Sequence, residues 1–87
     1  MPEYELIWSN LAISQMNKLP KTIRLAIYKS VGKLKTNPFR KEVKRLRGLP
    51  HFRLRVGDYQ VIFNIENNVF RVLIVKVGHR KNIYEKL

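Results

Sequence analysis

The spacing of the hydrophobic positions changes near Pro38, and this change divides the chain into two kinds of element. Before Pro38, apolar residues recur every three or four positions, which indicates helices, whereas after it they alternate with polar residues, which indicates strands. The apolar segment 4–8 precedes the helices and is predicted as a short strand. The expected order is therefore one strand, two helices and then further strands.

Two helices are expected between residues 9 and 38. The first follows Ser9, whose hydroxyl can accept a hydrogen bond from a first-turn amide, and its buried stripe is predicted to contain Leu11, Ala12, Met16 and Leu19. The second begins at Pro20, since the missing amide hydrogen of proline would be unpaired in a first turn anyway. Its predicted core face contains Ile23, Ile27, Val31 and Leu34. The pattern predicts a helical hairpin that ends at Thr36, Asn37 and Pro38.

Residues 52–66 carry a strong β-hairpin signal. Apolar residues at 52, 54 and 56 alternate with Arg53 and Arg55, and a second alternating run follows the turn residues Gly57 and Asp58. A two-residue turn at that position predicts the pairs Phe52 with Phe63, Leu54 with Val61 and Val56 with Tyr59. Arg53 then lies opposite Ile62, and Arg55 opposite Gln60, on the other side of the sheet.

A last strand is expected at residues 69–77, after a turn at Asn67 and Asn68. This segment is so rich in Val, Ile and Leu that it is predicted to be a central strand, buried on both faces and ended by Gly78. The fold class is therefore α+β with the order β-α-α-β-β-β, in which the helical hairpin packs on one face of an antiparallel-dominated sheet. Residues 1–87 are expected to form a single domain.

The charge of the chain narrows its partners. Eighteen Lys and Arg against six Asp and Glu give a formal net charge of +12 in 87 residues, which favours an anionic partner such as nucleic acid. The chain has no cysteine, so disulfides and thiolate metal sites are excluded. Neither a signal peptide nor a membrane span is predicted. The expectation is a cytoplasmic protein without a membrane partner.

The candidate chemistry is inferred by excluding reactions whose characteristic residue sets are not found in the sequence. The carboxylates are scattered and only His51 and His79 are present, so no metal site, cofactor, phosphate loop or Ser-His-Asp set is predicted. Phosphodiester cleavage without metal remains, in which the 2′-hydroxyl of RNA attacks its own phosphate. Arginines suit this chemistry because a preorganised cation stabilises the developing charge.

Four segments together carry a family resemblance: LPKTI at 19–23, RLRGLP at 45–50, FRLRVGDYQVIF at 52–63 and VGHRKNIY at 77–84. Nearly the whole chain resembles the RelE toxins of the RelE/ParE toxin-antitoxin superfamily. The resemblance implies a ribosome-dependent endoribonuclease that cuts translated messenger RNA in the aminoacyl site. It also implies a cognate acidic, RelB-like antitoxin, and a toxin-antitoxin complex that binds operator DNA through the antitoxin.

Residue roles follow from the same resemblance. It implies that Arg53 and Arg55 occupy the two basic catalytic positions of the first hairpin strand, that Arg80 stabilises the transition state and that Tyr84 orients or stacks on the nucleotide. His79, next to Arg80 and with an ordinary pKa near ~6.5, is the predicted candidate for the general base. Contacts to RNA or the ribosome are expected from Arg45, Arg47, Gln60 and Lys81.

Two departures from the family pattern keep alternatives open. The family commonly has Arg after the hairpin tyrosine, where this chain has the uncharged Gln60, so transition-state stabilisation is expected to be weaker. Some members have Lys where this chain has Arg53 and Arg55, and Arg is a poor general base because its pKa exceeds ~12. The alternatives are a ParE-like inhibitor of DNA gyrase, and a catalytically weakened module that binds nucleic acid or antitoxin.

Overall fold

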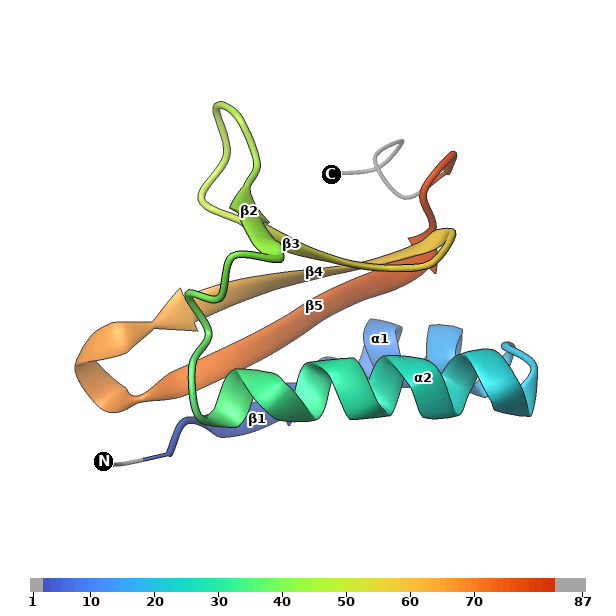
Figure 1. Ribbon diagram of the computed structural model, residues 1–87, viewed down its shortest axis with the longest axis horizontal. Helices are drawn as coiled ribbons and strands as arrows, with labels where there is room; N and C mark the ends of the chain where they lie inside the picture. The colour runs from blue at the N-terminus through green and yellow to red at the C-terminus, as the bar shows by residue number, and fades with distance from the viewer. Residues whose placement is uncertain (1–2, 83–87) are drawn as a thin grey trace.

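A five-stranded sheet with the strand order β1-β5-β4-β3-β2 organises the fold (Figure 1). The computed structural model describes residues 3–82. Two helices lie on one face of the sheet, where α1 packs on β5 and α2 packs on β3. The elements in chain order are β1 Glu5–Trp8, α1 Asn10–Asn17, α2 Lys21–Gly32, the 3-10 helix η1 Lys33–Lys35, β2 Val43–Arg45, β3 Phe52–Val56, β4 Tyr59–Glu66, the 3-10 helix η2 Asn67–Val69 and β5 Arg71–His79.

The predicted α+β class and the hairpin register are confirmed. Strands β3 and β4 pair with Phe52 opposite Phe63, Leu54 opposite Val61 and Val56 opposite Tyr59. All strand pairs are antiparallel except β1 with β5, which is parallel. The turn works because Gly57 has a φ of 60°, a conformation that glycine adopts without a Cβ clash.

The core lies between the helices and the sheet. Its buried residues come from both α-helices, from η1 and from strands β3, β4 and β5, and they are Ala12, Met16, Ile27, Val31, Leu34, Leu54, Val61, Phe63, Val72, Ile74 and Val77. The predicted stripe of α1 was wrong at Leu11, which is 52% exposed. Leu11 is adjacent to Ala12 in the helix, and the buried residues of α1 are Ala12 and Met16, so the buried stripe is narrower than the apolar one.

Three strand predictions need correction. The structure adds β2, which sequence patterning missed because it is three residues long and contains Lys44 and Arg45. Gly78 does not end β5, which continues to His79 because Gln60 and Tyr59 of β4 still pair with Gly78 and His79. Strand β5 is an interior strand as expected, but full burial is restricted to its helix-side residues.

At a β-bulge in β5, a hydrogen bond links the start of helix α1 to the sheet. Val61 pairs with Val77 and Phe63 with Ile74, so β5 contains one more residue than β4 over this stretch, and Val75 is left without a partner on β4. The Ser9 hydroxyl donates a 2.7 Å hydrogen bond to the Val75 carbonyl oxygen and accepts one from the Ala12 amide. As predicted, Ser9 therefore caps α1, and it also satisfies a backbone group that the bulge leaves free.

Candidate nucleic-acid interface

The pairing register sorts the charged residues onto the two faces of the sheet. Side chains of directly opposed residues share a face, and successive residues of a strand alternate between faces. Leu54 and Val61 belong to the core beneath the helices, so Arg53 and Arg55 lie on the opposite face. We call this the open face, because within residues 3–82 no helix packs on it (Figure 1).

Two adjacent rows of side chains cross the open face. In the first row, β2, β3, β4 and β5 contribute Lys44, Arg53, Ile62 and Lys76. In the second row, β3, β4 and β5 contribute Arg55, Gln60 and Gly78. The two rows bring the predicted residues Arg53, Arg55 and Gln60 together. Gln60 is only 3% exposed, whereas Arg55 is exposed and donates through Nε to the Gly57 carbonyl oxygen at 3.1 Å.

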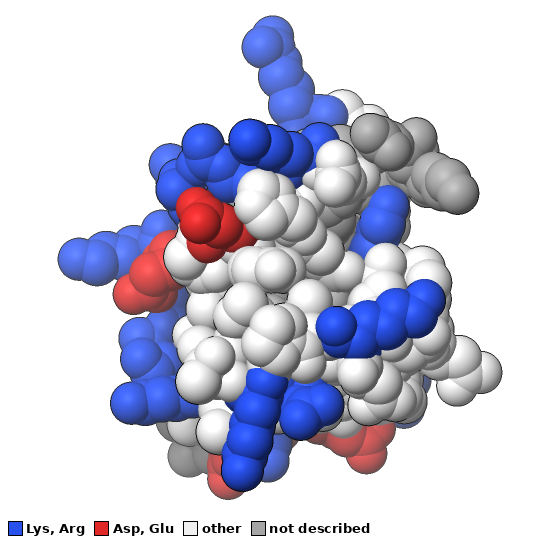
Figure 2. Space-filling model, turned by 90° about the vertical axis from the view of Figure 1, so that its right-hand side faces the viewer, with Lys and Arg blue, Asp and Glu red and all other residues white. Residues whose placement is uncertain are grey.

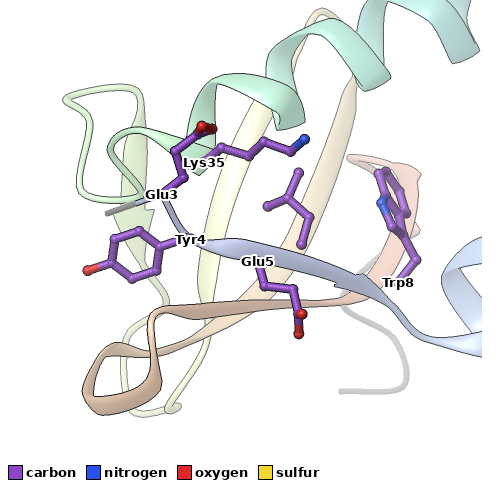
Figure 3. A pocket seen from close by; sticks show the side chains of 6 residues that line it. Glu3, Tyr4, Glu5, Trp8 and Lys35 are labelled. Atoms are coloured by element: carbon purple, nitrogen blue, oxygen red, sulfur yellow. The ribbon is translucent and has the colours of Figure 1, made fainter. Parts of the chain in front are cut away.

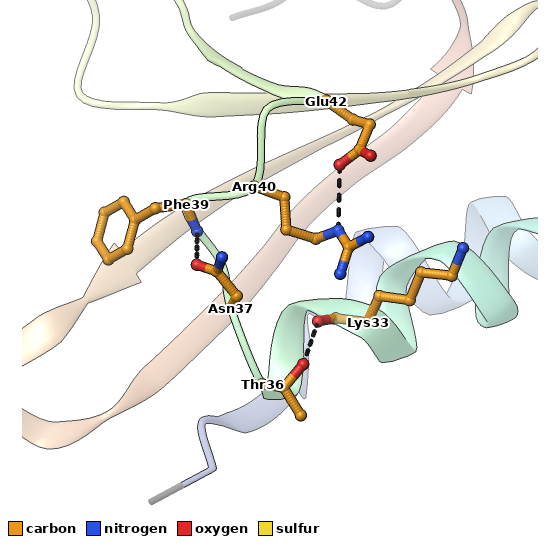
Figure 4. A network of polar contacts seen from close by, with 6 residues as sticks. All are labelled: Lys33, Thr36, Asn37, Phe39, Arg40 and Glu42. Carbon is orange, nitrogen blue, oxygen red and sulfur yellow. Dashed lines mark hydrogen bonds and ion pairs between the residues drawn. The ribbon is translucent and has the colours of Figure 1, made fainter. Parts of the chain in front are cut away.

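A depression of about 580 Å³ lies at the β2–β3 side of these rows. Its lining contains three cations and two carboxylates, together with a turn glycine: Glu42, Lys44, Arg53, Arg55, Gly57 and Asp58. Glu42 accepts a 3.1 Å hydrogen bond from Nε of Arg40 (Figure 4), and hydrogen bonding from its own backbone amide and from Arg40 lowers the pKa of its carboxyl. The lining of the depression therefore carries more cations than carboxylates, and one of its carboxylates, Glu42, has a lowered pKa.

The loop before β2 is held by short-range polar contacts. In Figure 4 the Thr36 hydroxyl donates to the Lys33 carbonyl oxygen at 3.2 Å, and the Phe39 amide donates to Oδ1 of Asn37 at 3.0 Å. These contacts end the helical segment and turn the chain from the helix layer to the sheet, as the predicted stop at residues 36–38 requires. They place Arg40 and Glu42 beside the depression.

Arg80 and Lys81 leave the end of β5 next to the hairpin turn. The Arg80 amide donates a 2.9 Å hydrogen bond to the Asp58 carbonyl oxygen, and both Arg80 and Lys81 are exposed. Figure 2 views this end of the molecule, where Lys and Arg side chains, with fewer Asp and Glu among them, surround an uncharged centre. The cations predicted from the hairpin and from the segment after β5 therefore meet around the β3–β4 turn.

The other described residues that were predicted for the site do not belong to the two rows of the open face. Arg45 is opposite Phe52 and His79 is opposite Tyr59, so both positions are on the helix-side face. The His79 and Tyr59 rings make an edge contact with centroids 5.5 Å apart. Arg47 is exposed in the loop between β2 and β3, where it lines a depression of about 550 Å³ together with Arg45. Tyr84 lies outside the described residues.

Three polar residues of the open face were missed by sequence reasoning. Lys76 shares the largely apolar strand β5 with one other Lys or Arg residue, Arg71, and its alternation with Val77 was the available signal. Lys44 was hidden because β2 was not predicted. His51 hydrogen-bonds through Nδ1 to Oδ1 of Asn64 at the far end of this face. Arg55 follows His51 by four positions, about 13 Å along an extended chain, so His51 lies apart from the Arg55 and Arg80 end.

A different depression, of about 490 Å³, lies along the edge strand β1 (Figure 3). It is lined by Glu3, Tyr4, Glu5, Leu6, Trp8 and Lys35. Two of these residues are carboxylates and Lys35 is the one cation in the lining, so this depression does not suit a polyanion. No group of three or more potential metal-ligand side chains occurs within residues 3–82, and no helix there is long and apolar enough to span a bilayer.

Comparison with solved structures places this architecture among bacterial and archaeal toxins. The toxin chain of a RelBE2 toxin-antitoxin complex from Mycobacterium tuberculosis is 28% identical, with a TM-score of 0.80 over 90% of this chain and 99% of that one. An archaeal RelE-RelB complex from Pyrococcus horikoshii OT3 gives 23% identity, a TM-score of 0.81 and coverage of 92% and 98%. The RelBE complex of E. coli gives 24%, 0.76, and 87% and 95%.

The sequence also matches a family model, that of the ParE toxin of the type II toxin-antitoxin system parDE, over residues 6–84. A comparison with curated protein sequences gives no significant match. Fold, cationic face and family match together define a toxin of a type II toxin-antitoxin system. The chain belongs to the RelE/ParE superfamily of these toxins.

Proposed function

We propose that this toxin is a ribosome-dependent endoribonuclease that cleaves translated messenger RNA without a metal ion. The observation that carries the proposal is the grouping of Arg53 and Arg55 on the open face, with Arg80 anchored beside the hairpin turn at the end of that face. Guanidinium groups in a fixed arrangement suit a phosphodiester whose charge increases in the transition state.

The reaction is internal to the RNA. The 2′-hydroxyl oxygen forms a bond to the neighbouring phosphorus and loses its proton, while the bond from phosphorus to the 5′-oxygen breaks and that oxygen gains a proton. The products are a 2′,3′-cyclic phosphate and a 5′-hydroxyl. In the proposed roles, Arg53, Arg55 and Arg80 stabilise the phosphorane, Tyr84 orients the nucleotide, and Gln60, Lys81, Arg47 and Arg45 contact RNA or ribosome.

The proton-transfer group is a separate question. His79 was predicted for this role, and its Nδ1 accepts a 3.2 Å hydrogen bond from the Lys81 amide. The neutral ring then carries its hydrogen on Nε2, so His79 would need to release Lys81 before its Nδ1 could act as a base. Replacement of His79 with Gln, followed by cleavage across a pH series, tests the assignment. A changed pH profile of cleavage would support it, and an unchanged profile would remove it.

The decisive experiment for the enzyme uses ribosomes programmed with a defined messenger RNA and purified toxin. Cuts in phase with codons, with 2′,3′-cyclic phosphate ends, are the expected result. Substituting 2′-deoxyribose at the cleaved nucleotide should abolish the cut, because it removes the nucleophile. Intact messenger RNA under these conditions would exclude the proposal.

A gyrase inhibitor is the second candidate, since the matching family model is that of ParE toxins. Inhibition of gyrase-catalysed supercoiling by the purified toxin, with no RNA cleavage, would favour it. A third possibility, a module that binds nucleic acid or antitoxin but cleaves weakly, is motivated by the uncharged Gln60 within the cationic rows. Binding without cleavage or supercoiling inhibition would identify it.

We further propose a cognate, acidic, RelB-like antitoxin as the partner in the cell. Leu11, Leu25 and Tyr28 are 52%, 56% and 46% exposed on the helices, and the Tyr28 ring contacts Trp8 of edge strand β1 at 5.3 Å. The contact between Tyr28 and Trp8 joins the exposed apolar side chains of α2 to the β1 edge, and the net charge of +12 is complementary to an acidic partner. In this proposal, the toxin-antitoxin complex binds operator DNA through the antitoxin.

The product of a neighbouring small acidic reading frame is the protein to test. It should co-purify with the toxin, and Leu25→Ser should weaken the complex about tenfold or more, because it removes an exposed apolar contact. Equal affinity of the Leu25→Ser variant and the parent would exclude α2 from the contact.

A further inference from the structure

Lys76 is a cation in the interior of the sheet rather than at its edge. It stands on the open face of β5, directly opposite Ile62 of β4, and Ile62 is in turn opposite Arg53. The ion pairs among the described residues are formed by Arg40 and Arg71 with Glu5, Glu42 and Glu66, and they leave Lys76 out. Within residues 3–82 no carboxylate forms an ion pair with Lys76, so its charge is available to an anionic ligand.

The residues around Lys76 show which part of it faces outward. Ile62 is fully buried although it points away from the helices, while Arg53 and Lys76 on either side of it are half-buried. Long basic side chains commonly lay their aliphatic stems over an apolar neighbour and keep the charged head in water. The stems of Arg53 and Lys76 can therefore cover Ile62 while both heads remain accessible.

The position of Lys76 connects two parts of the interface. Lys44, Arg53 and Lys76 lie in one row across four strands, which at a strand spacing of about 4.8 Å extends for about 14 Å. Lys76 is also the diagonal neighbour of Gln60 in the second row, at about 7–8 Å. Gly78, opposite Gln60, has no side chain that could separate the Lys76 head from the second row.

We propose that Lys44, Arg53 and Lys76 form a phosphate-binding row for single-stranded RNA that crosses the strands, with Lys76 holding a phosphate next to the one contacted by Arg55 and Arg80. The inference rests on the proposed RNA substrate and names two residues, Lys44 and Lys76, that the sequence analysis did not assign. Their role is binding along the strand, so it can be measured without cleavage.

The test is the salt dependence of binding to a short, fluorescently labelled 2′-O-methyl RNA, which has no free 2′-hydroxyl and is not cut. Each phosphate contact on a single strand contributes about 0.7 to the slope of log K against log salt. Lys76→Gln and Lys44→Gln should each reduce the slope by about 0.7, whereas Lys76→Arg should retain it. Lys29→Gln, on the exposed side of α2, is the matched control and should keep the parental slope.

The outcomes distinguish the hypothesis that the row binds phosphates from the hypothesis that the protein cleaves RNA. A parental slope for folded Lys76→Gln, or a parent that does not bind this RNA, would overturn the row. A weakened antitoxin complex with unchanged RNA binding would assign Lys76 to the protein partner and would also overturn it. The expected slopes together with intact messenger RNA on programmed ribosomes would support the row while rejecting the endoribonuclease.

Discussion

The backbone amide of Arg80 donates a 2.9 Å hydrogen bond to the carbonyl oxygen of Asp58. This bond ties the segment after β5 to the turn between β3 and β4, so the Arg80 backbone has a fixed place beside the strand that carries Arg53 and Arg55. The contact uses main-chain atoms alone. The Arg80 side chain can therefore be changed without removing its anchor.

Arg80→Ala is expected to lower messenger RNA cleavage on programmed ribosomes by about 10²-fold or more, because it removes a cation directed at the transition state. The thermal unfolding midpoint should remain close to that of the parent, since the bond to Asp58 persists. Arg24→Ala on α2 is the matched control. Cleavage by Arg80→Ala at the parental rate would remove Arg80 from the catalytic assignment.

Gly57→Ala should destabilise the hairpin by about 1–2 kcal/mol, because alanine is strained at the φ of 60° that this turn requires. A Cβ at this position would meet no atom within 4 Å, so the cost comes from the backbone conformation and not from a clash. Gly57→Asn should cost less, as asparagine tolerates the left-handed region. Urea unfolding of the three proteins measures the difference, and equal stability of Gly57→Ala and the parent would contradict the turn assignment.

Gln15→Ala should destabilise the fold by about 1–3 kcal/mol, because it leaves the Val77 amide without its acceptor beside the bulge. The amide now donates to Oε1 of Gln15 at 2.7 Å. Gln15→Glu retains an oxygen at that position and should retain most of the stability. Ser14→Ala, an exposed neighbour in the same helix, serves as the control in urea unfolding. A loss confined to helix propensity, equal in Gln15→Ala and Ser14→Ala, would count against this hydrogen bond.

Glu42→Gln should strengthen binding of single-stranded RNA by about two- to fivefold at neutral pH, because it removes a negative charge from the lining of the depression beside Lys44, Arg53 and Arg55. Glu3→Gln, at the β1 edge, is the control for the change in net charge. Hydrogen bonding lowers the pKa of Glu42 below its ordinary 4.5, so the parent is ionised at neutral pH. Equal affinities of Glu42→Gln and the parent at neutral pH would separate Glu42 from the interface.

The pH dependence of Glu42 has a definite sign. A carboxyl with a lower pKa in the folded protein contributes stability above its unfolded pKa, and loses it as the pH falls through the folded pKa. The stability difference between the parent and Glu42→Gln should therefore be present at neutral pH and should disappear in acid, below pH 4.5. Unfolding midpoints measured at both pH values test this sign.

Local periodicity was sufficient for most of the fold. The hairpin register followed from alternation and a two-residue turn, and the cap at Ser9 followed from its place before an apolar helical stripe. The missed strand β2 shows the limit of this reasoning, because a three-residue edge strand is specified by its neighbour β3 rather than by its own pattern. The exposure of Leu11 has the same kind of cause: a helix buries only the stripe that the sheet covers.

The sequence by itself determined the α+β order, the placement of Arg53 and Arg55 opposite the core, and an excess of positive charge. Only the tertiary structure determined which cations from separate parts of the sequence lie in the same row on the open face. The bulge at Val75 reverses the alternation of β5 between Ile74 and Lys76, and pairing with β4 then brings Lys76 into the row of Arg53 while His79 joins Tyr59 on the helix side. Such registers depend on contacts between strands, and no single strand's periodicity encodes them.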